Sequence, residues 1–436
     1  MKLTVNDVLK AAPGCRLPFG NPSVEFEGAS VDSRNVGEGT LFVGIRGEQQ
    51  DGAIYAPDAL RDGAAAAVIS EPTWRWLEGE FVAIGKPVII AEDPLAAMQA
   101  AGRVALERTG ATVIGVTGAT GKTTTKDILV AMLAAVGVRV YGTPGNRNTE
   151  IGVPMSLLEM PADTQVAVIE MGMRGMGQIA ELARLAPPTV ACISAIGPVH
   201  LELLGSVANV AAAKFELLQA LPRRGTAVVP AGDPHLEPLL ATLDPQVSVV
   251  GFGERPPVEL DMDLTTQWQY RCAAAAYACC EAIGHAPPDG TRVEIALSPM
   301  RGNIRPLAVG GTLIEDCYNA NPIAMNAALA DLVARPGRHV AILADMFELG
   351  SDERALHLQV GAAAAAAGVD LLIGVGTRSA WYVQGAGETA SVHFRSVDDA
   401  VAGVGEHLRP DDVVLVKGSR GMALERLTRA IAADAQ

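Results

Sequence analysis

The sequence is poor in several features that would indicate other classes of protein. Aromatic residues make up 4% of the chain, so stacking of bases or sugars on rings is not its main means of binding. The six cysteines form no C-x-x-C pair, which argues against a zinc site and favours reduced, mostly buried thiols. Basic residues are also scarce, because 34 Lys and Arg against 49 Asp and Glu leave a net charge of -15. A nucleic acid or an anionic membrane surface is therefore not an expected partner.

Long apolar segments are missing as well. The opening residues, MKLTVNDVLK, lack the basic stretch followed by an apolar stretch that marks a signal peptide. No apolar run reaches the roughly 18 residues that a membrane-spanning helix needs, and the Ala tract at 361–368 is too short. We therefore expect a cytoplasmic protein with no membrane insertion, and we expect a monomer.

The chain does have enough material for several hydrophobic cores. Hydrophobic residues make up 49% of its 436 residues, and at about 150 residues per domain this length predicts three domains. Residues 1–92 contain short β-like runs at 40–45 and 88–91 between Gly, Asp and Pro turns, without a long helical pattern, which predicts a small α/β module.

Two series of fully apolar runs follow, separated by helical patterns. The first series lies at 112–116, 166–169, 189–193 and 226–229, and the second at 312–314, 340–343, 371–375 and 413–416. Strands that are apolar throughout and joined by helices predict parallel sheets covered on both faces. We therefore predict a central domain at 93–300 and a C-terminal domain at 301–436.

A phosphate-binding loop is predicted at the start of the central domain. The segment ATVIGVTGATGKTTTKDILVAMLAAVG reads as a strand, a glycine-rich turn and a helix. Gly118 and Gly121 permit a tight turn whose N–H groups face an anion, at the positive end of the helix dipole. Lys122 supplies a charge for the β- and γ-phosphates, and Thr123 or Thr124 a hydroxyl for Mg²⁺. ATP or GTP binding follows from this pattern.

Three further residues fall where the ligands of an open α/β sheet gather. Glu170 ends the run QVAVIE, where it is either a Mg²⁺ ligand or a solvated acid. His200 lies in the loop after the next strand, and a lone histidine is more often structural than a ligand. Lys214 falls on the apolar stripe of a helix that starts near Ser206, so its ammonium has to reach water, pair with an acid, lose its proton or be modified.

Taken together, the motifs resemble those of the ATP-dependent Mur ligases of peptidoglycan synthesis. The resemblance rests on GATGKTT, TPGNRNTEIGVP, IEMG and the spacing of His200 and Lys214, and VDSR with GTLFVGIRGEQQDG extends it toward the N-terminus. IEDCYNANPIAMNAAL, ILADMFELG and VLVKGSRGM are similar to the branch of the family that adds D-alanyl-D-alanine. It implies an α/β fold of three domains: a small N-terminal UDP-binding domain, a central parallel-sheet P-loop ATPase domain and a C-terminal Rossmann-like domain.

The resemblance also implies roles for individual residues. The nucleotide would be bound by Gly118, Ala119, Thr120, Gly121, Lys122, Thr123, Thr124, Asn319 and Asn321. One Mg²⁺ would be held by Thr123 and Glu170, and His200 would serve a second metal. Lys214 would be carbamylated to give an anionic metal ligand. The residues implied in catalysis are Lys122, Lys214, His200, Asn146, Arg301 and Asp345, and those implied in substrate binding are Asp32, Ser33, Arg34, Asp316, Lys417 and Ser419.

The implied reaction joins D-alanyl-D-alanine to UDP-N-acetylmuramoyl-tripeptide through an acyl phosphate, with ATP converted to ADP and phosphate. Two alternatives stay open: another Mur-like ligase, which adds diaminopimelate or lysine or extends folate with glutamate, and an NTP-binding module without turnover. The last is motivated by a departure from the family pattern. Where the family has H-N-x-x-N beside the adenine, this chain has Gln267, Trp268 and Arg271, and Arg271 either stacks on the base or caps a solvated helix face. The chain departs from the family pattern at four other positions. Ala53 stands where the family usually has His, Thr149 and Ser194 stand where Asn is common, and Ala344 stands where Gly is usual.

Overall fold

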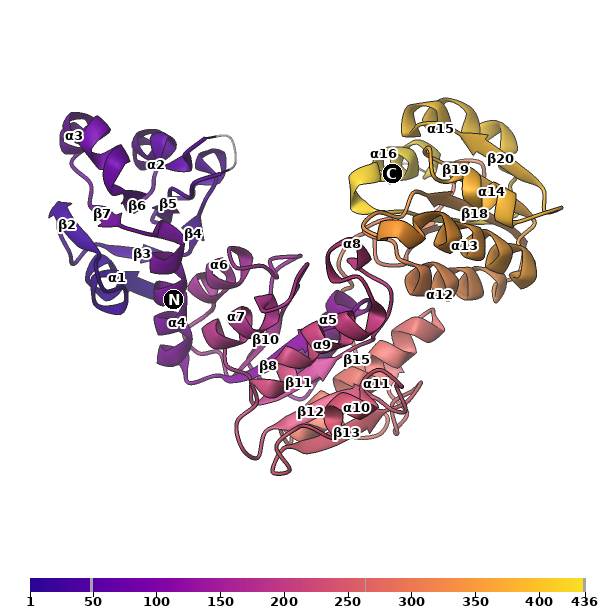
Figure 1. Cartoon of the computed structure of the whole chain (residues 1–436), viewed down its shortest axis with the longest axis horizontal. Helices are drawn as coiled ribbons and strands as arrows, with labels where there is room; N and C mark the ends of the chain where they lie inside the picture. The colour runs from indigo at the N-terminus through magenta and orange to yellow at the C-terminus, as the bar shows by residue number, and fades with distance from the viewer. Residues whose placement is uncertain (48–49, 263, 434–436) are drawn as a thin grey trace.

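The computed structural model describes residues 1–47, 50–262 and 264–433. Its three larger sheets each carry their own helices, and Figure 1 shows them arranged as a V with the central sheet at the apex. The N-terminal and C-terminal parts form the two arms. Each large sheet lies within one of the ranges 1–92, 93–300 and 301–436, whose boundaries stay a prediction.

The N-terminal arm holds a five-stranded sheet in the order β2-β7-β6-β5-β4. Its elements are β1 (Lys2–Thr4), α1 (Val5–Ala11), β2 (Arg16–Phe19), β3 (Glu25–Glu27), β4 (Ala29–Ser30), η1 (Ser33–Asn35), β5 (Leu41–Val43), η2 (Gly52–Tyr55), α2 (Ala56–Arg61), β6 (Ala66–Ser70), α3 (Glu71–Ile84) and β7 (Val88–Ala91). The expectation of no long helix here is wrong, because α3 has 14 residues. Glu71, Gly79 and scattered aromatic residues obscure its pattern, whereas Trp74 stacks on Phe81 with ring centroids 5.8 Å apart.

The central domain holds a six-stranded sheet in the order β13-β12-β11-β8-β10-β9, in which every pair is parallel as predicted. Its strands are β8 (Thr112–Thr117), β9 (Val140–Gly142), β10 (Val166–Glu170), β11 (Val190–Ile193), β12 (Thr226–Pro230) and β13 (Ser248–Phe252), with the small pair β14 (Asp261–Met262) and β15 (Arg292–Val293). Its helices are α4 (Pro94–Thr109), α5 (Lys122–Ala135), α6 (Gly152–Glu159), α7 (Gln178–Leu185), α8 (Leu201–Leu204), α9 (Val207–Gln219), α10 (Glu237–Leu240) and α11 (Gln267–Ala282).

The C-terminal arm holds another six-stranded sheet in the order β16-β17-β21-β18-β19-β20. Only the edge strand β16 runs antiparallel to its neighbour within this sheet. Its elements are β16 (Asn303–Pro306), β17 (Thr312–Glu315), α12 (Pro322–Val333), β18 (Arg338–Ala344), η3 (Gly350–Asp352), α13 (Glu353–Ala367), β19 (Leu371–Val375), α14 (Ala380–Gly385), β20 (Ser391–Phe394), α15 (Val397–Gly403), η4 (Val404–His407), β21 (Asp412–Lys417), η5 (Arg420–Met422) and α16 (Glu425–Ile431).

Apolar clusters cover both faces of the central sheet, which explains why its strands are apolar throughout. α7 and α9 pack on one face, and α5 and α11 on the other. This packing fixes the carboxyl ends of β8, β10 and β11 side by side. The sheet therefore presents the loops after these three strands at one edge.

The cysteines are mostly buried, as the sequence predicts. All six thiols are free, and all but the partly exposed Cys15 are buried. None of the helices in the described ranges combines the length and apolar character needed to cross a bilayer.

Candidate functional site

The loop between β8 and α5 has the form that the sequence predicts. Gly121 takes a φ of 82°, a left-handed conformation that side chains rarely adopt, and α5 begins directly after it at Lys122. A Cβ at Gly118 would lie only 2.0 Å from Ser194 Oγ. The Ser194 hydroxyl contacts the carbonyl oxygens of Thr120, at 2.6 Å, and Thr117, at 3.1 Å. Ser194 therefore holds the loop against the end of β11, and only glycine fits beneath it.

Lys122 spans this loop. Its Nζ donates to the carbonyl of Gly118 at 2.8 Å. Burial lowers the pKa of the Lys122 ammonium and the positive charge of Arg301 lowers it further, whereas Glu170 opposes both. Since an ammonium has three N–H donors, the bond to Gly118 leaves two of them for an anion in the loop.

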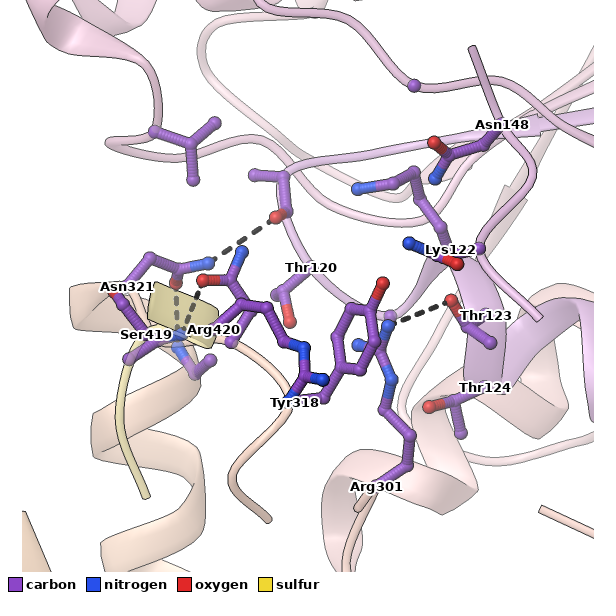
Figure 2. A pocket seen from close by; sticks show the side chains of 18 of the residues that line it. Thr120, Lys122, Thr123, Thr124, Asn148, Arg301, Tyr318, Asn321, Ser419 and Arg420 are labelled. Carbon is purple, nitrogen blue, oxygen red and sulfur yellow. Dashed lines mark hydrogen bonds between the residues drawn. The ribbon is translucent and has the colours of Figure 1, made fainter. Parts of the chain in front are cut away.

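Glu170 forms the second part of the site, at the end of β10. Its Oε2 accepts from Thr123 Oγ1 at 2.8 Å, and its Oε1 accepts from Asn148 Nδ2 at 2.6 Å. Arg301 reaches the same hydroxyl, with its Nη2 3.2 Å from Thr123 Oγ1 (Figure 2). Glu170 is 1% exposed, so a cation bound here would face a largely desolvated carboxylate.

These oxygen atoms fit one Mg²⁺. Magnesium is usually held by one or two protein oxygen ligands together with nucleotide phosphates and water, and Glu170 with Thr123 supplies such a pair beside the phosphate loop. The described ranges hold no group of three His, Cys, Asp or Glu that could bind a metal by itself. His200 instead pairs with Glu348 across the domain boundary, with Nδ1 and Oε2 2.5 Å apart.

Lys214 lies on the inward face of α9, as its place on the apolar stripe predicts. It is 1% exposed, and burial followed by the charge of Lys122 places the pKa of its amine well below the ordinary value. Within the described ranges no residue forms a hydrogen bond or an ion pair with this amine. Of the fates open to a buried lysine, pairing with an acid is not seen among the described residues, which leaves contact with water in the cavity, loss of the proton or modification.

Residues of the C-terminal domain face the phosphate loop. The Arg301 guanidinium stacks on Tyr318, 3.8 Å from the ring centroid, and burial raises the pKa of the Tyr318 phenol. Asn321 caps α12 and places its Nδ2 3.4 Å from the carbonyl of Ala119. Figure 2 shows Tyr318, Asn321, Ser419 and Arg420 opposite Lys122 and Thr123.

These groups enclose a cavity of about 1120 Å³ between the central and C-terminal domains. Its size suits a nucleotide and a second ligand better than a single small molecule. The sequence-predicted residues that line it are Ala119, Thr120, Gly121, Lys122, Thr123, Thr124, Asn146, Glu170, His200, Arg301, Asp316, Asn319, Asn321, Lys417 and Ser419. In it, Lys417 Nζ lies 2.6 Å from Asp316 Oδ2.

The other predicted residues lie elsewhere. Lys214 is beneath the cavity wall near Lys122, and Asp345 is buried behind Ser419, where its Oδ1 accepts from the Ser379 backbone at 2.8 Å. Asp32, Ser33 and Arg34 belong to the N-terminal arm, outside the cavity. Asp32 there accepts from the Arg34 guanidinium, and this contact lowers the pKa of Asp32 to about 2.

Several residues of the cavity were not singled out from the sequence. Asn148 and Tyr318 occur within GNRN and YNANP. These motifs therefore indicate the segments that form the site, but they do not identify Asn148 and Tyr318 as the residues that contact it. Arg271 pairs with Glu254 at 2.5 Å and is not part of the cavity lining, whereas Trp268 is part of it. The second interpretation of Arg271, as a residue of a helix face, therefore describes it better than stacking on a base.

Known proteins match this chain in sequence along all three predicted domains. Family models described as "Mur ligase family, catalytic domain", "Mur ligase middle domain" and "Mur ligase, glutamate ligase domain" match residues 25–107, 116–274 and 300–420. The UDP-N-acetylmuramoyl-tripeptide--D-alanyl-D-alanine ligase of Bacillus subtilis is 30% identical, with 98% of each chain covered. The enzyme of the same name from Escherichia coli is 32% identical over 94% of each chain.

Solved structures agree in fold. The crystal structure of MurF from Acinetobacter baumannii has a TM-score of 0.85 at 26% identity and covers 98% of both chains. MurF ligase from Thermotoga maritima in complex with ADP has a TM-score of 0.79 at 25% identity and covers 93% of this chain and 96% of its own. The matches in sequence and in fold extend over all three sheets, and the chain therefore belongs to the Mur ligase family.

Proposed function

We propose that this protein is an ATP-dependent ligase that joins D-alanyl-D-alanine to UDP-N-acetylmuramoyl-tripeptide in peptidoglycan synthesis. The observation that carries the proposal is the full-length similarity to ligases of that name, at 30% and 32% identity. The phosphate loop supports it, because Lys122, Thr123 and Glu170 meet beside a large cavity that both domains line.

The residues of the cavity have distinct parts in this reaction. The backbone from Gly118 to Gly121 and the Lys122 ammonium would bind the ATP phosphates. Thr123 and Glu170 would hold Mg²⁺, which neutralises phosphate charge during the transfer. Arg301, fixed on Tyr318, would bring a second positive charge to the same point. Asn146 stands beside Tyr318 and would contact the transferring phosphoryl group.

The chemistry takes two steps. A carboxylate oxygen of the tripeptide attacks the γ-phosphorus, the bond from that phosphorus to the bridging oxygen breaks, and ADP leaves. The dipeptide amine then attacks the acyl carbon, loses a proton, and expels phosphate from the tetrahedral adduct. Lys122 and Arg301 counter the charge that spreads over the phosphoryl oxygens. Because water would destroy the acyl phosphate, closure of the cavity by the C-terminal domain excludes solvent.

Carbamylation of Lys214 is part of the proposal. A deprotonated amine can add to CO₂ with loss of one proton, which gives an anionic carbamate. The support is that Lys214 is buried, lies near Lys122 and has no partner among the residues in the described ranges. A carbamate there would exchange repulsion between two ammonium groups for attraction. With His200, it would serve a second Mg²⁺ when His200 leaves Glu348.

Release of ADP with different acceptors tests the function. The purified protein is incubated with ATP, Mg²⁺, UDP-N-acetylmuramoyl-tripeptide and either D-alanyl-D-alanine or single amino acids. We expect ADP only with the dipeptide. ADP with lysine, diaminopimelate or glutamate would instead assign the chain to another Mur-like ligase, and absence of ADP with every acceptor would favour a non-catalytic module.

Replacement of Glu170 tests the proposed Mg²⁺ ligand. We expect Glu170→Gln to lower the rate of ADP formation at least about 100-fold and to raise the Mg²⁺ concentration needed for half-maximal rate, because an amide is a weaker ligand than a carboxylate. Glu237→Gln, which alters an exposed carboxylate of the same domain outside the cavity lining, serves as the matched control and should stay near the parent rate. Equal Mg²⁺ dependence of the two variants would exclude Glu170 as a ligand.

A further inference from the structure

The cavity continues beyond the phosphate loop along α12. Its lining there includes Asn321, Ala324, Ala327, Ala328 and Asp331 from α12, and Thr266, Trp268 and Gln269 from the start of α11. Asn321 lies against the phosphate loop, at Ala119. Asp331 lies ten positions after Asn321, which corresponds to a rise of about 15 Å along the helix. This extension therefore leads away from the phosphates over a distance comparable to a nucleotide.

One side of this extension is lined by small apolar side chains of α12. Ala324, Ala327 and Ala328 have the spacing of one helix face, and their small side chains leave room in front of α12. The indole of Trp268 also lines the space, and its ring lies so close to the loop that a Cβ at Gly121 would stand 3.1 Å from Cζ2. A planar ring fits between such surfaces, because stacking on an indole is favourable for any nucleobase.

One buried carboxylate lies at the far end. Asp331 is 9% exposed, and its Oδ1 accepts from the backbone N–H of Gln267 at 3.0 Å. Burial raises the pKa of Asp331 to about 6, whereas its contacts with Gln267, Thr266 and Arg335 favour the charged form. The group is thus ionised near neutral pH. A carboxylate has about four acceptor positions, so acceptors remain after these contacts.

Of the three residues that stand in place of the family's H-N-x-x-N, Trp268 lines this space and the other two do not. Gln267 is exposed and contributes its backbone to Asp331, and Arg271 is bound to Glu254. The side chain of Gln269 is also engaged, since its Oε1 accepts from the backbone of Thr265 and Thr266. Among the residues of the described lining at this end, Asp331 is the one that carries a charge.

We infer that Asp331 selects the nucleotide base, by accepting a hydrogen bond from the exocyclic amino group at position 6 of a purine whose ring lies against Trp268 and the alanine face of α12. The inference rests on the proposed function, because it places the phosphates in the loop at Gly121. In this orientation a 6-oxo purine would bring its carbonyl oxygen, in place of a donor, toward the carboxylate and would lose the hydrogen bond. Trp268 contributes affinity for the ring without distinguishing one purine from another.

The test varies the nucleotide and the residue together. Steady-state kcat/KM for phosphate release is measured with ATP, GTP and the triphosphate of unsubstituted purine riboside, which lacks the amino group. The Kd of each of the three corresponding diphosphates is measured as well. We expect the parent protein to prefer ATP over the purine analogue by about tenfold, the effect of one hydrogen bond to a charged group. Asp331→Ala should use the two equally well.

Two further variants separate recognition of the base by Asp331 from stacking of the base on Trp268. Asp331→Asn keeps an acceptor for Gln267 and offers an N–H₂ group to a 6-oxo base, so its GTP-to-ATP ratio should rise about tenfold. Trp268→Ala should weaken all three nucleotides by about tenfold with unchanged ratios. Asp411→Ala removes an exposed carboxylate from the same domain and serves as the control.

The outcomes distinguish the inference from the function on which it rests. If the parent protein forms ADP and Asp331→Ala keeps the parent's ratio of ATP to the purine analogue, Asp331 does not read the base. If the parent protein forms no ADP with any acceptor, the proposed function itself fails. Thermal unfolding of each variant shows whether loss of the contact between Asp331 and the first turn of α11 has affected the fold.

Discussion

Lys122→Ala is expected to lower the rate of ADP formation at least about 1000-fold, which corresponds to about 4 kcal/mol of transition-state stabilisation. The reason is electrostatic. The Lys122 ammonium stands within the phosphate loop, close to the desolvated Glu170 and Arg301, where charges interact more strongly than in water. Alanine removes the group that follows the phosphoryl oxygens as their charge redistributes. Single-turnover measurement of ADP with saturating ligands reports this step directly.

The fold should tolerate this change. Lys122 donates one hydrogen bond, to Gly118, so its loss costs about 1 kcal/mol of unfolding free energy. Lys122→Arg keeps the charge but presents a planar guanidinium in place of a compact ammonium, and we expect it to recover only a small part of the rate. Lys10→Ala, at an exposed lysine of the N-terminal arm, should leave the rate unchanged. A Lys122→Ala protein within tenfold of the parent would remove Lys122 from the mechanism.

The central strands and the phosphate loop could be predicted because their signals are local. Thr112–Thr117 is a continuous apolar run, and the Gly-Lys-Thr sequence follows it directly, so strand, turn and helix can be read in order. The inward position of Lys214 can be predicted for a similar reason, since helical spacing alone places this residue on the apolar stripe of α9. The face of a helix on which a side chain lies follows from its spacing to the apolar residues of the same helix, and it depends little on the rest of the fold.

Contacts between domains could not be predicted in this way. His200 and Glu348 are 148 residues apart, and nothing in either segment indicates that they pair. The same holds for Asp331 and the start of α11, which meet because α12 of one domain packs against α11 of the other. α3 is hard to predict for a different reason. Its mixture of acidic and aromatic residues with Gly79 gives a weak pattern, and the stacked Trp74 and Phe81 stabilise it by packing.

Lys214→Ala is expected to be inactive in ADP formation and to regain part of its activity with added formate or acetate. A buried, unpaired ammonium is unfavourable, and Lys122 nearby makes a second positive charge still less favourable. Conversion of the amine to an anion would remove both unfavourable contributions. If the working form is a carbamate, alanine removes the anion and leaves a space that a short carboxylate can enter.

The controls depend on charge. Lys122→Ala lacks a cation, so the same carboxylates should not rescue it, and the parent protein should be unaffected or slightly inhibited by them. Removal of dissolved CO₂ should slow the parent but not the rescued variant, because only the parent needs CO₂ to form its carbamate. Parent-level activity of Lys214→Ala without added carboxylate would mean that Lys214 serves packing alone. Rescue by carboxylates of increasing size should stop where the acid exceeds the volume of the deleted side chain, which would locate the anion at the position of the lysine rather than elsewhere in the cavity.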